Sequence, residues 1–424
     1  MNSRVVFIVW CSWLIPSLTS QTPPNPIAPS PATPATLQQK ISDAQKRIKA
    51  DSQSWQPYAD LATAYLRLGR DTEDVAPYNE AETAVQHLLQ LSPGNYEGQK
   101  LEAAVLLGKH EFAGALKLAT ELNHKVPDDV TGWSLLVDIH AAIGGYADAE
   151  REAQWILDLR PGSALGFEKA AGLRDLFGDA EGAVEFYQEA NRRTSPNDTV
   201  QRAWLFTQIA RVHLGADNLK PAQAAVDQAL ALFPQSQLAA DIVADIEIAQ
   251  GKYAEAAAAR EKIYQTVKSA GNLYAWAEAL KRAGSKEQAA SAFEKFERQA
   301  LAETHAAYNA NHELIYLYTD YKNNPSEALK LAQTEESVRQ DDSTLAAAAW
   351  AFFQNGKYAE AQNRMNRALA VGVRNPLYFC HAAQIAAKAN DAAAAAKYQK
   401  ELSSFNQTNC AAAVPVQTAK EVMK

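Results

Sequence analysis

The sequence predicts an all-α protein, in which similar pairs of helices stack in a row as an α-solenoid. The segment GKYAEA occurs at 251–256 and again at 356–361, and the two starts are 105 positions apart, three lengths of 35 residues. Prolines recur at a similar spacing, at positions 93, 127, 161, 196 and 234. Self-similarity with a period of 20 to 50 residues is typical of repeat architectures, because each unit buries its apolar face only against its neighbours.

The composition is that of a mildly acidic protein with enough apolar residues for a large core. The chain has 424 residues, of which 47% are hydrophobic, and its 41 basic and 49 acidic side chains give a formal charge of −8. Nucleic-acid-binding proteins usually present a strongly basic face. The composition therefore gives no support to a nucleic-acid partner.

Residues 1–20 have the layout of a secretory signal peptide. Arg4 precedes an apolar run at 5–15, and the small residues Ser17, Thr19 and Ser20 follow it. The run is well short of the ~20 residues that span a bilayer as a helix. We expect a periplasmic or secreted protein with no membrane span in the mature chain, and an uncleaved membrane anchor is the alternative.

The signal peptide is followed by a proline-rich segment at 21–35. Six prolines fall between positions 22 and 34. Because proline fixes φ and lacks a backbone donor, this segment is expected to be an extended, disordered linker.

Residues 36–54 are predicted to form a helix that caps the first unit of the solenoid. Thr36 and Gln39 make a capping-box pattern at its start. Leu37, Ile41 and Ala44 then fall on one helical face. We expect the solenoid itself over 55–408 and a C-terminal tail over 409–424.

The plan of one unit is clearest between Val130 and Pro161. An apolar segment predicts a first helix, Gly144 a turn, and a second apolar segment a second helix that ends before Pro161. Glycine permits a backbone conformation that is closed to other residues. Ala149 is small, which suits a close contact between the two helices.

This pattern resembles the tetratricopeptide repeat, a unit of two antiparallel helices in about 34 residues. The residues that carry the resemblance include Gly108, Phe112, Ala115 and Pro127; Gly178, Ala183, Tyr187 and Ala190; Gly251, Tyr253 and Ala256; and Gly356, Tyr358, Ala361 and Ala368. The resemblance covers about ten units, the first, fifth and eighth of them irregular. It implies a right-handed superhelix with a concave groove lined by the first helix of each unit.

The resemblance also assigns residues to that groove. Aromatic residues and arginine commonly anchor interfaces, and they gather here in the C-terminal half, which suggests a partner there. The alternative for the last two residues of this set is that they belong to the core between repeats. The predicted groove residues are Trp204, Arg211, Tyr274, Lys281, Arg282, Glu313, Tyr321, Trp350 and Phe353.

Catalytic and metal-binding patterns give no candidate site, and no cofactor is implied. His305 and His312 lack other ligands at metal-binding spacing. Asp241 and Asp245 lie one helical turn apart, a spacing that suits acid–base chemistry but also a solvated helix face.

The cysteines suggest a disulfide in the last unit. After removal of the signal peptide only Cys380 and Cys410 remain. Antiparallel helices bring the start of the first helix near the end of the second, and export places both thiols in an oxidising compartment. The alternative is two unpaired cysteines.

The sequence therefore predicts a non-enzymatic scaffold that binds an unidentified protein or an extended peptide in the groove of an exported array. An accessory factor in cell-envelope assembly or polysaccharide export, a structural spacer, and an all-α enzyme with an acidic cleft are the alternatives.

Overall fold

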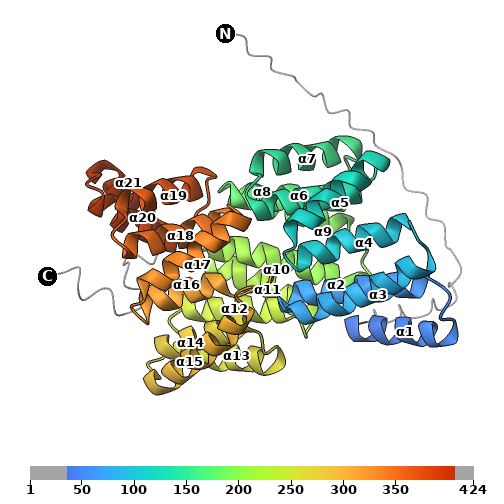
Figure 1. The fold of residues 1–424 in the computed structure, drawn as a ribbon, viewed down its shortest axis with the longest axis horizontal. Helices are drawn as coiled ribbons and strands as arrows, with labels where there is room; N and C mark the ends of the chain where they lie inside the picture. Colours follow the sequence, from blue (N-terminus) through green and yellow to red (C-terminus); the bar gives the residue numbers. More distant parts are fainter. Residues whose placement is uncertain (1–35, 406–424) are drawn as a thin grey trace, which may run out of the picture. The chain divides into compact units, whose positions relative to one another are not determined.

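A computed structural model describes residues 36–405, and within this range the chain contains 21 α-helices and no strand (Figure 1). The first helix, α1 (Leu37–Ala50), stands alone, and the other twenty form ten consecutive pairs. The pairs are α2 (Gln56–Thr72) with α3 (Val75–Leu91), α4 (Tyr96–Gly108) with α5 (Phe112–Lys125), α6 (Val130–Ile143) with α7 (Tyr146–Leu159), α8 (Ala164–Leu176) with α9 (Ala180–Arg193), α10 (Thr199–Gly215) with α11 (Leu219–Leu232), α12 (Gln237–Ala249) with α13 (Tyr253–Thr266), α14 (Ala270–Arg282) with α15 (Lys286–Glu303), α16 (Asn311–Asp320) with α17 (Pro325–Val338), α18 (Asp342–Gln354) with α19 (Tyr358–Ala370), and α20 (Pro376–Lys388) with α21 (Ala392–Leu402).

Helix α1 begins as the sequence predicts. The Thr36 side chain accepts a hydrogen bond from the backbone N–H of Gln39, and the Gln39 side chain accepts one from the backbone N–H of Thr36. Leu37, Ile41 and Ala44 are buried, so one face of α1 covers the start of the solenoid.

Each pair repeats the same local devices. In the pair α6–α7, Gly144 ends the first helix with φ of +85°, in the left-handed region that favours glycine. Ala149 in the second helix is fully buried, and Ala256 and Ala361 are buried at the corresponding places of later pairs. The recurrence of glycine and alanine in the sequence therefore reflects turns and close helix contacts, as predicted.

The three irregular units differ in helix length. Helices α2 and α3 have 17 residues each, so the extra residues of the first unit lengthen its helices. Helix α10 also has 17 residues, whereas α16 has ten and follows the long helix α15.

Helices distant in the sequence also touch one another. Arg67 on α2 forms two hydrogen bonds of 2.9 Å with Asp198, which caps α10. Asp71, near the end of α2, accepts hydrogen bonds from the side chain of Ser236 and the backbone of Gln237 at the start of α12. These contacts join the first pair to the fifth and sixth.

A second set of contacts joins the third and fourth pairs to the ninth and tenth. The backbone N–H of Gln340 donates to the carbonyl of Ile143 at 3.2 Å. A Cβ on Gly178, in the α8–α9 turn, would lie 2.5 Å from the carbonyl oxygen of Gly372, before α20. The resemblance implies one concave groove, and these contacts connect distant parts of that inner face.

Candidate ligand cavities

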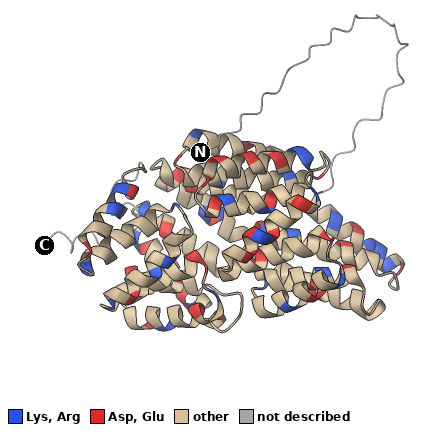
Figure 2. Ribbon diagram, turned by 90° about the horizontal axis from the view of Figure 1, so that it is seen from above, with Lys and Arg blue, Asp and Glu red and all other residues tan. Residues whose placement is uncertain are grey.

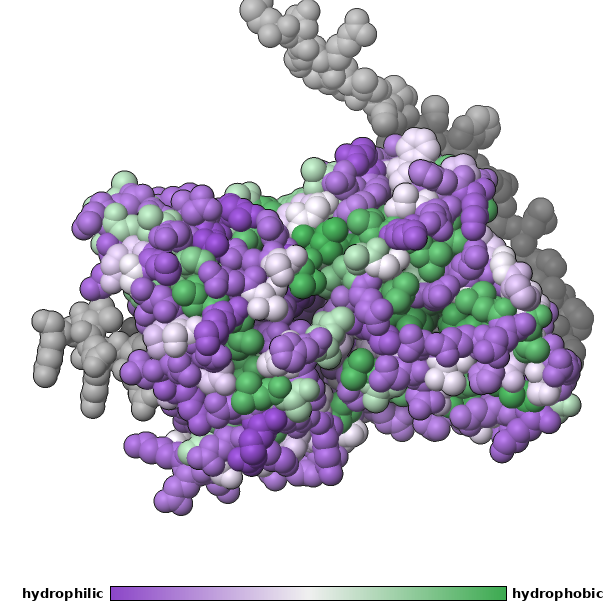
Figure 3. Space-filling model, viewed as in Figure 1, coloured by the Kyte–Doolittle hydropathy of each residue, from purple (hydrophilic) through white to green (hydrophobic). Residues whose placement is uncertain are grey.

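Two large cavities among the described helices are candidate ligand sites, and Figure 3 shows one face of the molecule hollowed near its centre. The Tyr187 cavity, of about 1040 Å³, is lined mainly by α2, α4, α6, α8 and α10, the first helices of the first five pairs. The Tyr308 cavity, of about 1010 Å³, is lined mainly by α12, α14, α16 and the segment before α16. Arg211 and Arg339 line both cavities, which places these two side chains at the boundary between them.

Figure 2 shows basic and acidic residues interspersed over the helices. Most charged groups that line the Tyr187 cavity form a hydrogen bond or ion pair with another residue. Lys169 contacts Asp138 at 2.7 Å and Glu168 at 3.1 Å. Burial lowers the pKa of Lys169, but the two carboxylates outweigh burial and raise the pKa. Lys169 therefore stays charged and holds α6 and α8 together.

Trp204, one of the predicted groove residues, forms part of the wall of this cavity. The guanidinium of Arg70 lies 4.4 Å from the centre of the Trp204 ring and donates to Gln201 at 2.7 Å. This cation–π contact ties α2 to α10. Trp204 is half-buried, so only part of its ring remains for a ligand.

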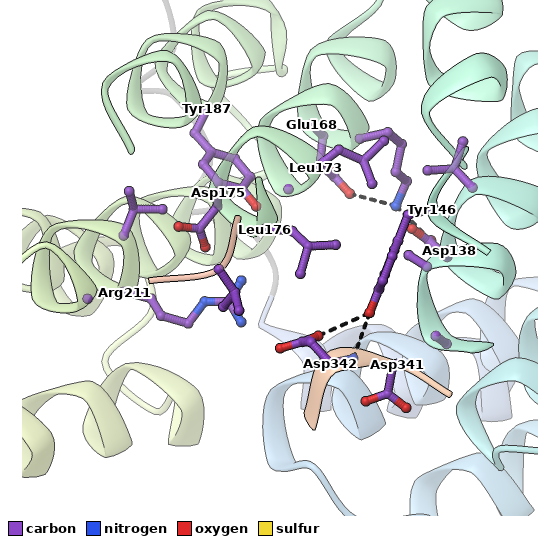
Figure 4. A pocket seen from close by; sticks show the side chains of 18 of the residues that line it. Asp138, Tyr146, Glu168, Leu173, Asp175, Leu176, Tyr187, Arg211, Asp341 and Asp342 are labelled. Carbon is purple, nitrogen blue, oxygen red and sulfur yellow. Dashed lines mark hydrogen bonds and ion pairs between the residues drawn. The ribbon is translucent and has the colours of Figure 1, made fainter. Parts of the chain in front are cut away.

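Arg211, Asp175 and Tyr187 meet at one end of the Tyr187 cavity (Figure 4). Arg211 was predicted from the sequence, whereas Asp175 and Tyr187 were not recognised as site residues. Among residues 36–405, neither the guanidinium of Arg211 nor the carboxylate of Asp175 makes a hydrogen bond or ion pair. Burial raises the pKa of Asp175, and the nearby Arg211 opposes that effect.

In the Tyr308 cavity the carboxylates of Asp241 and Asp245 share one partner, Arg260, which reaches them from α13. Burial raises the pKa of Asp241 to about 7, against the effect of Arg260 and with the help of the nearby carboxylates of Glu73 and Asp245. The pair therefore forms an ion-pair network, which weakens the hypothesis of two solvated carboxylates as well as that of a free catalytic pair. Glu313, a predicted groove residue, lines the same cavity.

Predicted residues on α14 and α16 come together around Glu278. Tyr274 donates to Glu278 at 3.2 Å, and Tyr321, which follows α16, donates to it as well. The Lys281 ammonium lies 3.8 Å from the centre of the Tyr321 ring. Arg282 is close enough to lower the pKa of Tyr321, although burial raises that pKa more strongly. These side chains are largely engaged with one another.

Trp350 corrects the groove prediction. Its side chain is fully buried, donates to Asp320 at 2.7 Å and stacks on His381 with 3.8 Å between ring centres. Phe353 is half-buried and stacks on Trp350 at 4.9 Å. The alternative interpretation, that these two residues belong to the core between repeats, is the one that the structure supports.

Cys380 is buried in α20 and is disulfide-bonded, while its predicted partner Cys410 lies outside the described residues.

Within 36–405 no three His, Cys, Asp or Glu residues gather as metal ligands. In the same range, every helix is too short or too polar to span a membrane. The predicted signal peptide, linker and C-terminal tail all fall outside the described range.

Few features of the sequence indicated the Tyr187 cavity. The groove prediction favoured the C-terminal half, but the larger cavity is lined mostly by first helices of the N-terminal half. The available signal was the presence of ionisable residues on those mainly apolar helices, such as Arg70, Asp138, Lys169 and Asp175.

Comparison with known proteins supports the repeat. The family model described as tetratricopeptide repeat matches residues 207–270 and 346–407. No curated protein matches the sequence.

Several solved structures also match this chain, all at low sequence identity. The Cut9–Hcn1 complex matches at 12% identity and a TM-score of 0.48, and the match covers 87% of this chain and 60% of that chain. Yeast Tom70 matches at 13% identity and a TM-score of 0.41, covering 91% and 92%. PilW, a type IV pilus biogenesis factor, matches at 14% identity and a TM-score of 0.41, covering 49% and 94%.

Proposed function

Since this chain is a tetratricopeptide repeat protein, we propose that it is a non-enzymatic scaffold, exported from the cytoplasm, that binds a protein partner on the inner face of its helices. The observation that carries the proposal is the pair of cavities lined by the inner helices. Each has a volume of about 1000 Å³ and mixes apolar walls with charged groups. Concave sites of this size and composition are the usual places for ligands.

The shape of the inner face favours an extended segment of the partner over a folded domain. The contacts Arg67–Asp198 and Gln340–Ile143 hold distant parts of the inner face together. A folded domain needs a broad open surface, whereas a single extended strand of polypeptide fits between helices. The partner is therefore expected to insert a loop or a terminal segment.

Site-specific photo-crosslinking tests the proposal. A photoreactive amino acid is placed at Leu176, which lines the Tyr187 cavity, or at Leu238, which lines the Tyr308 cavity. The control position is Leu301 on α15, which is 48% exposed and lines neither cavity. Crosslinks to one protein from the inner positions alone support the proposal, and equal crosslinking from Leu301 contradicts it.

Export is tested separately with residues 1–35. These residues are fused to a reporter enzyme that is active only after export. Activity of the fusion, together with a mature protein that begins near residue 21, supports the proposed location. A reporter that stays inactive contradicts it without bearing on the binding surface.

A further inference from the structure

The Tyr187 cavity contains two charged groups that form no hydrogen bond or ion pair with any side chain or backbone group of residues 36–405. Five carboxylates and five cationic side chains line this cavity. Eight of these ten are engaged elsewhere, for example Lys169 with Asp138 and Glu168, and Asp342 with Tyr146. Only Asp175 and Arg211 make no hydrogen bond or ion pair within the part of the chain that the structure describes.

These two groups lie on neighbouring inner helices at the same end of the cavity. Asp175 comes from the end of α8 and Arg211 from the last half of α10, and Figure 4 shows both beside Tyr187 from α9. Each is near enough to the other for Arg211 to oppose the rise in the pKa of Asp175. Both side chains line the cavity but form no ion pair with each other, so each can face a ligand in the cavity.

Tyr187 adds a third polar group at this end. The residue is only 2% exposed, and its hydroxyl makes no hydrogen bond to any residue in 36–405. Burial raises the pKa of Tyr187 to about 12, so the phenol is neutral and can donate one hydrogen bond.

The three groups define the chemistry of a ligand. Asp175 accepts hydrogen bonds from a cation, Arg211 donates two parallel hydrogen bonds to a carboxylate, and Tyr187 donates one more. The apolar side chains of Leu173, Leu176 and Val212 line the same cavity. A ligand that satisfies all of these groups carries an ammonium, a carboxylate and an apolar body.

We propose that the Tyr187 cavity binds a small apolar zwitterion, an α-amino acid or a short peptide, with its ammonium on Asp175 and its carboxylate on Arg211 and Tyr187. Either source supplies the same two charged ends. The cavity, at about 1040 Å³, is large enough for several residues. This site goes beyond the proposed scaffold function, because its ligand is a small molecule and needs no protein partner.

Isothermal titration of the full-length protein with four probes tests the inference. The probes are L-leucine, N-acetyl-L-leucine, L-leucinamide and trileucine. Binding of leucine that weakens at least 10-fold when either charged end is capped is the expected result for an amino acid. Binding of trileucine that exceeds leucine at least 10-fold identifies a short peptide as the ligand.

Substitutions at the two anchors assign each end of the ligand. Arg211→Gln is expected to weaken leucine or trileucine binding at least 10-fold while leaving the affinity for leucinamide unchanged. Asp175→Asn is expected to weaken leucine or trileucine binding at least 10-fold while leaving the affinity for N-acetyl-leucine unchanged. Arg192→Gln and Glu181→Gln, both on α9 and outside the cavity, serve as controls.

Two outcomes overturn the inference. One is that neither leucine nor trileucine binds at 10 mM. The other is that binding is weakened neither by blocking the ammonium or carboxylate of the probe nor by Arg211→Gln or Asp175→Asn. The capped probes act on the unmodified protein, so the test stands even if a variant folds poorly. No partner protein is present, so failure here leaves the scaffold function open.

Discussion

Tyr146 on α7 and Asp342 at the start of α18 exchange two hydrogen bonds across 196 residues of sequence. The backbone N–H of Asp342 donates to the phenol oxygen at 2.7 Å, and the phenol donates to the Asp342 carboxylate at 3.1 Å (Figure 4). Repeats in a solenoid usually contact only their neighbours. In this protein a tyrosine of the third pair instead accepts a hydrogen bond from the first backbone N–H of α18, the first helix of the ninth pair.

Tyr146→Phe is expected to lower the free energy of unfolding by about 2 kcal/mol, because it leaves a backbone N–H and a carboxylate without their partner. Urea unfolding measures the change, and faster amide exchange at the start of α18 locates it. Tyr253→Phe, at an exposed tyrosine on α13, is the matched control. Equal stability of Tyr146→Phe and wild type would show that the hydrogen bonds contribute nothing.

Alanine substitutions at Gly178 and Gly356 can be compared to measure what the contact between the α8–α9 turn and Gly372 contributes to stability. Gly356 serves as the reference because its turn makes no such contact. Both have positive φ, +81° and +72°, so alanine strains either backbone by roughly 1–2 kcal/mol. At Gly356 an added Cβ meets nothing within 4 Å, whereas at Gly178 it meets the backbone of Gly372.

Gly178→Ala is therefore expected to destabilise the protein by at least about 1 kcal/mol more than Gly356→Ala, in line with the cost of overpacking. Thermal and urea unfolding of both variants provide the comparison. If the two substitutions cost the same, the α8–α9 turn and the segment before α20 do not constrain each other.

The sequence predicted the parts of the fold that repeat and missed those that occur once. Gly144 and Ala149 were recognisable because every pair meets the same requirement for a turn and a close contact. The Arg67–Asp198 and Tyr146–Asp342 contacts join non-equivalent residues, so no period in the sequence marks them. The same reason explains why Asp175 was not recognised as a site residue.

Trp350 shows a second limit, because tryptophan anchors cores as well as interfaces. Helix α18 is buried on nearly all sides from Thr344 to Phe352. Its sequence, LAAAAWAFF, is apolar all round, which indicates a buried helix rather than one with a face for a ligand. That signal was present and favoured the core interpretation.

Trp350→Ala is accordingly expected to cost about 3–5 kcal/mol of stability, as for other large core residues. Trp155→Ala on α7, where the side chain is 46% exposed, is expected to cost far less. Urea unfolding distinguishes the two. A small effect at Trp350 with weakened partner binding would restore the groove assignment.

The disulfide prediction for Cys380 and Cys410 is tested by counting thiols. The denatured, unreduced mature protein is expected to contain no free thiol, and Cys410→Ser is expected to expose one. Loss of the disulfide is expected to lower the free energy of unfolding by about 2–4 kcal/mol. The reason is that a bond between Cys380 and Cys410 closes the loop between them and so restricts the unfolded chain. Two free thiols in the untreated protein would exclude the bond.

His381 makes the stability of the C-terminal pairs depend on pH. The imidazole is fully buried between α16, α18 and α20, and neither ring nitrogen has a hydrogen-bond partner in the described chain. Burial lowers its pKa to about 3, below the value of about 6.5 in the unfolded chain. Between pH 6.5 and about pH 3, His381 is protonated in the unfolded chain but stays neutral in the folded protein. The free energy of unfolding therefore decreases as the pH falls through this range.

His381→Phe removes this titration and keeps a flat ring against Trp350. Below pH 6 the stability of wild type is expected to fall relative to the variant by up to about 1.4 kcal/mol per pH unit. Asp320 titrates in the opposite sense, since burial raises its pKa to about 7, but it is present in both proteins and largely cancels in the difference. Urea unfolding at pH 7.5, 6.0 and 5.0 measures that difference, and parallel pH profiles for the two proteins would mean that His381 accepts its proton without loss of the fold.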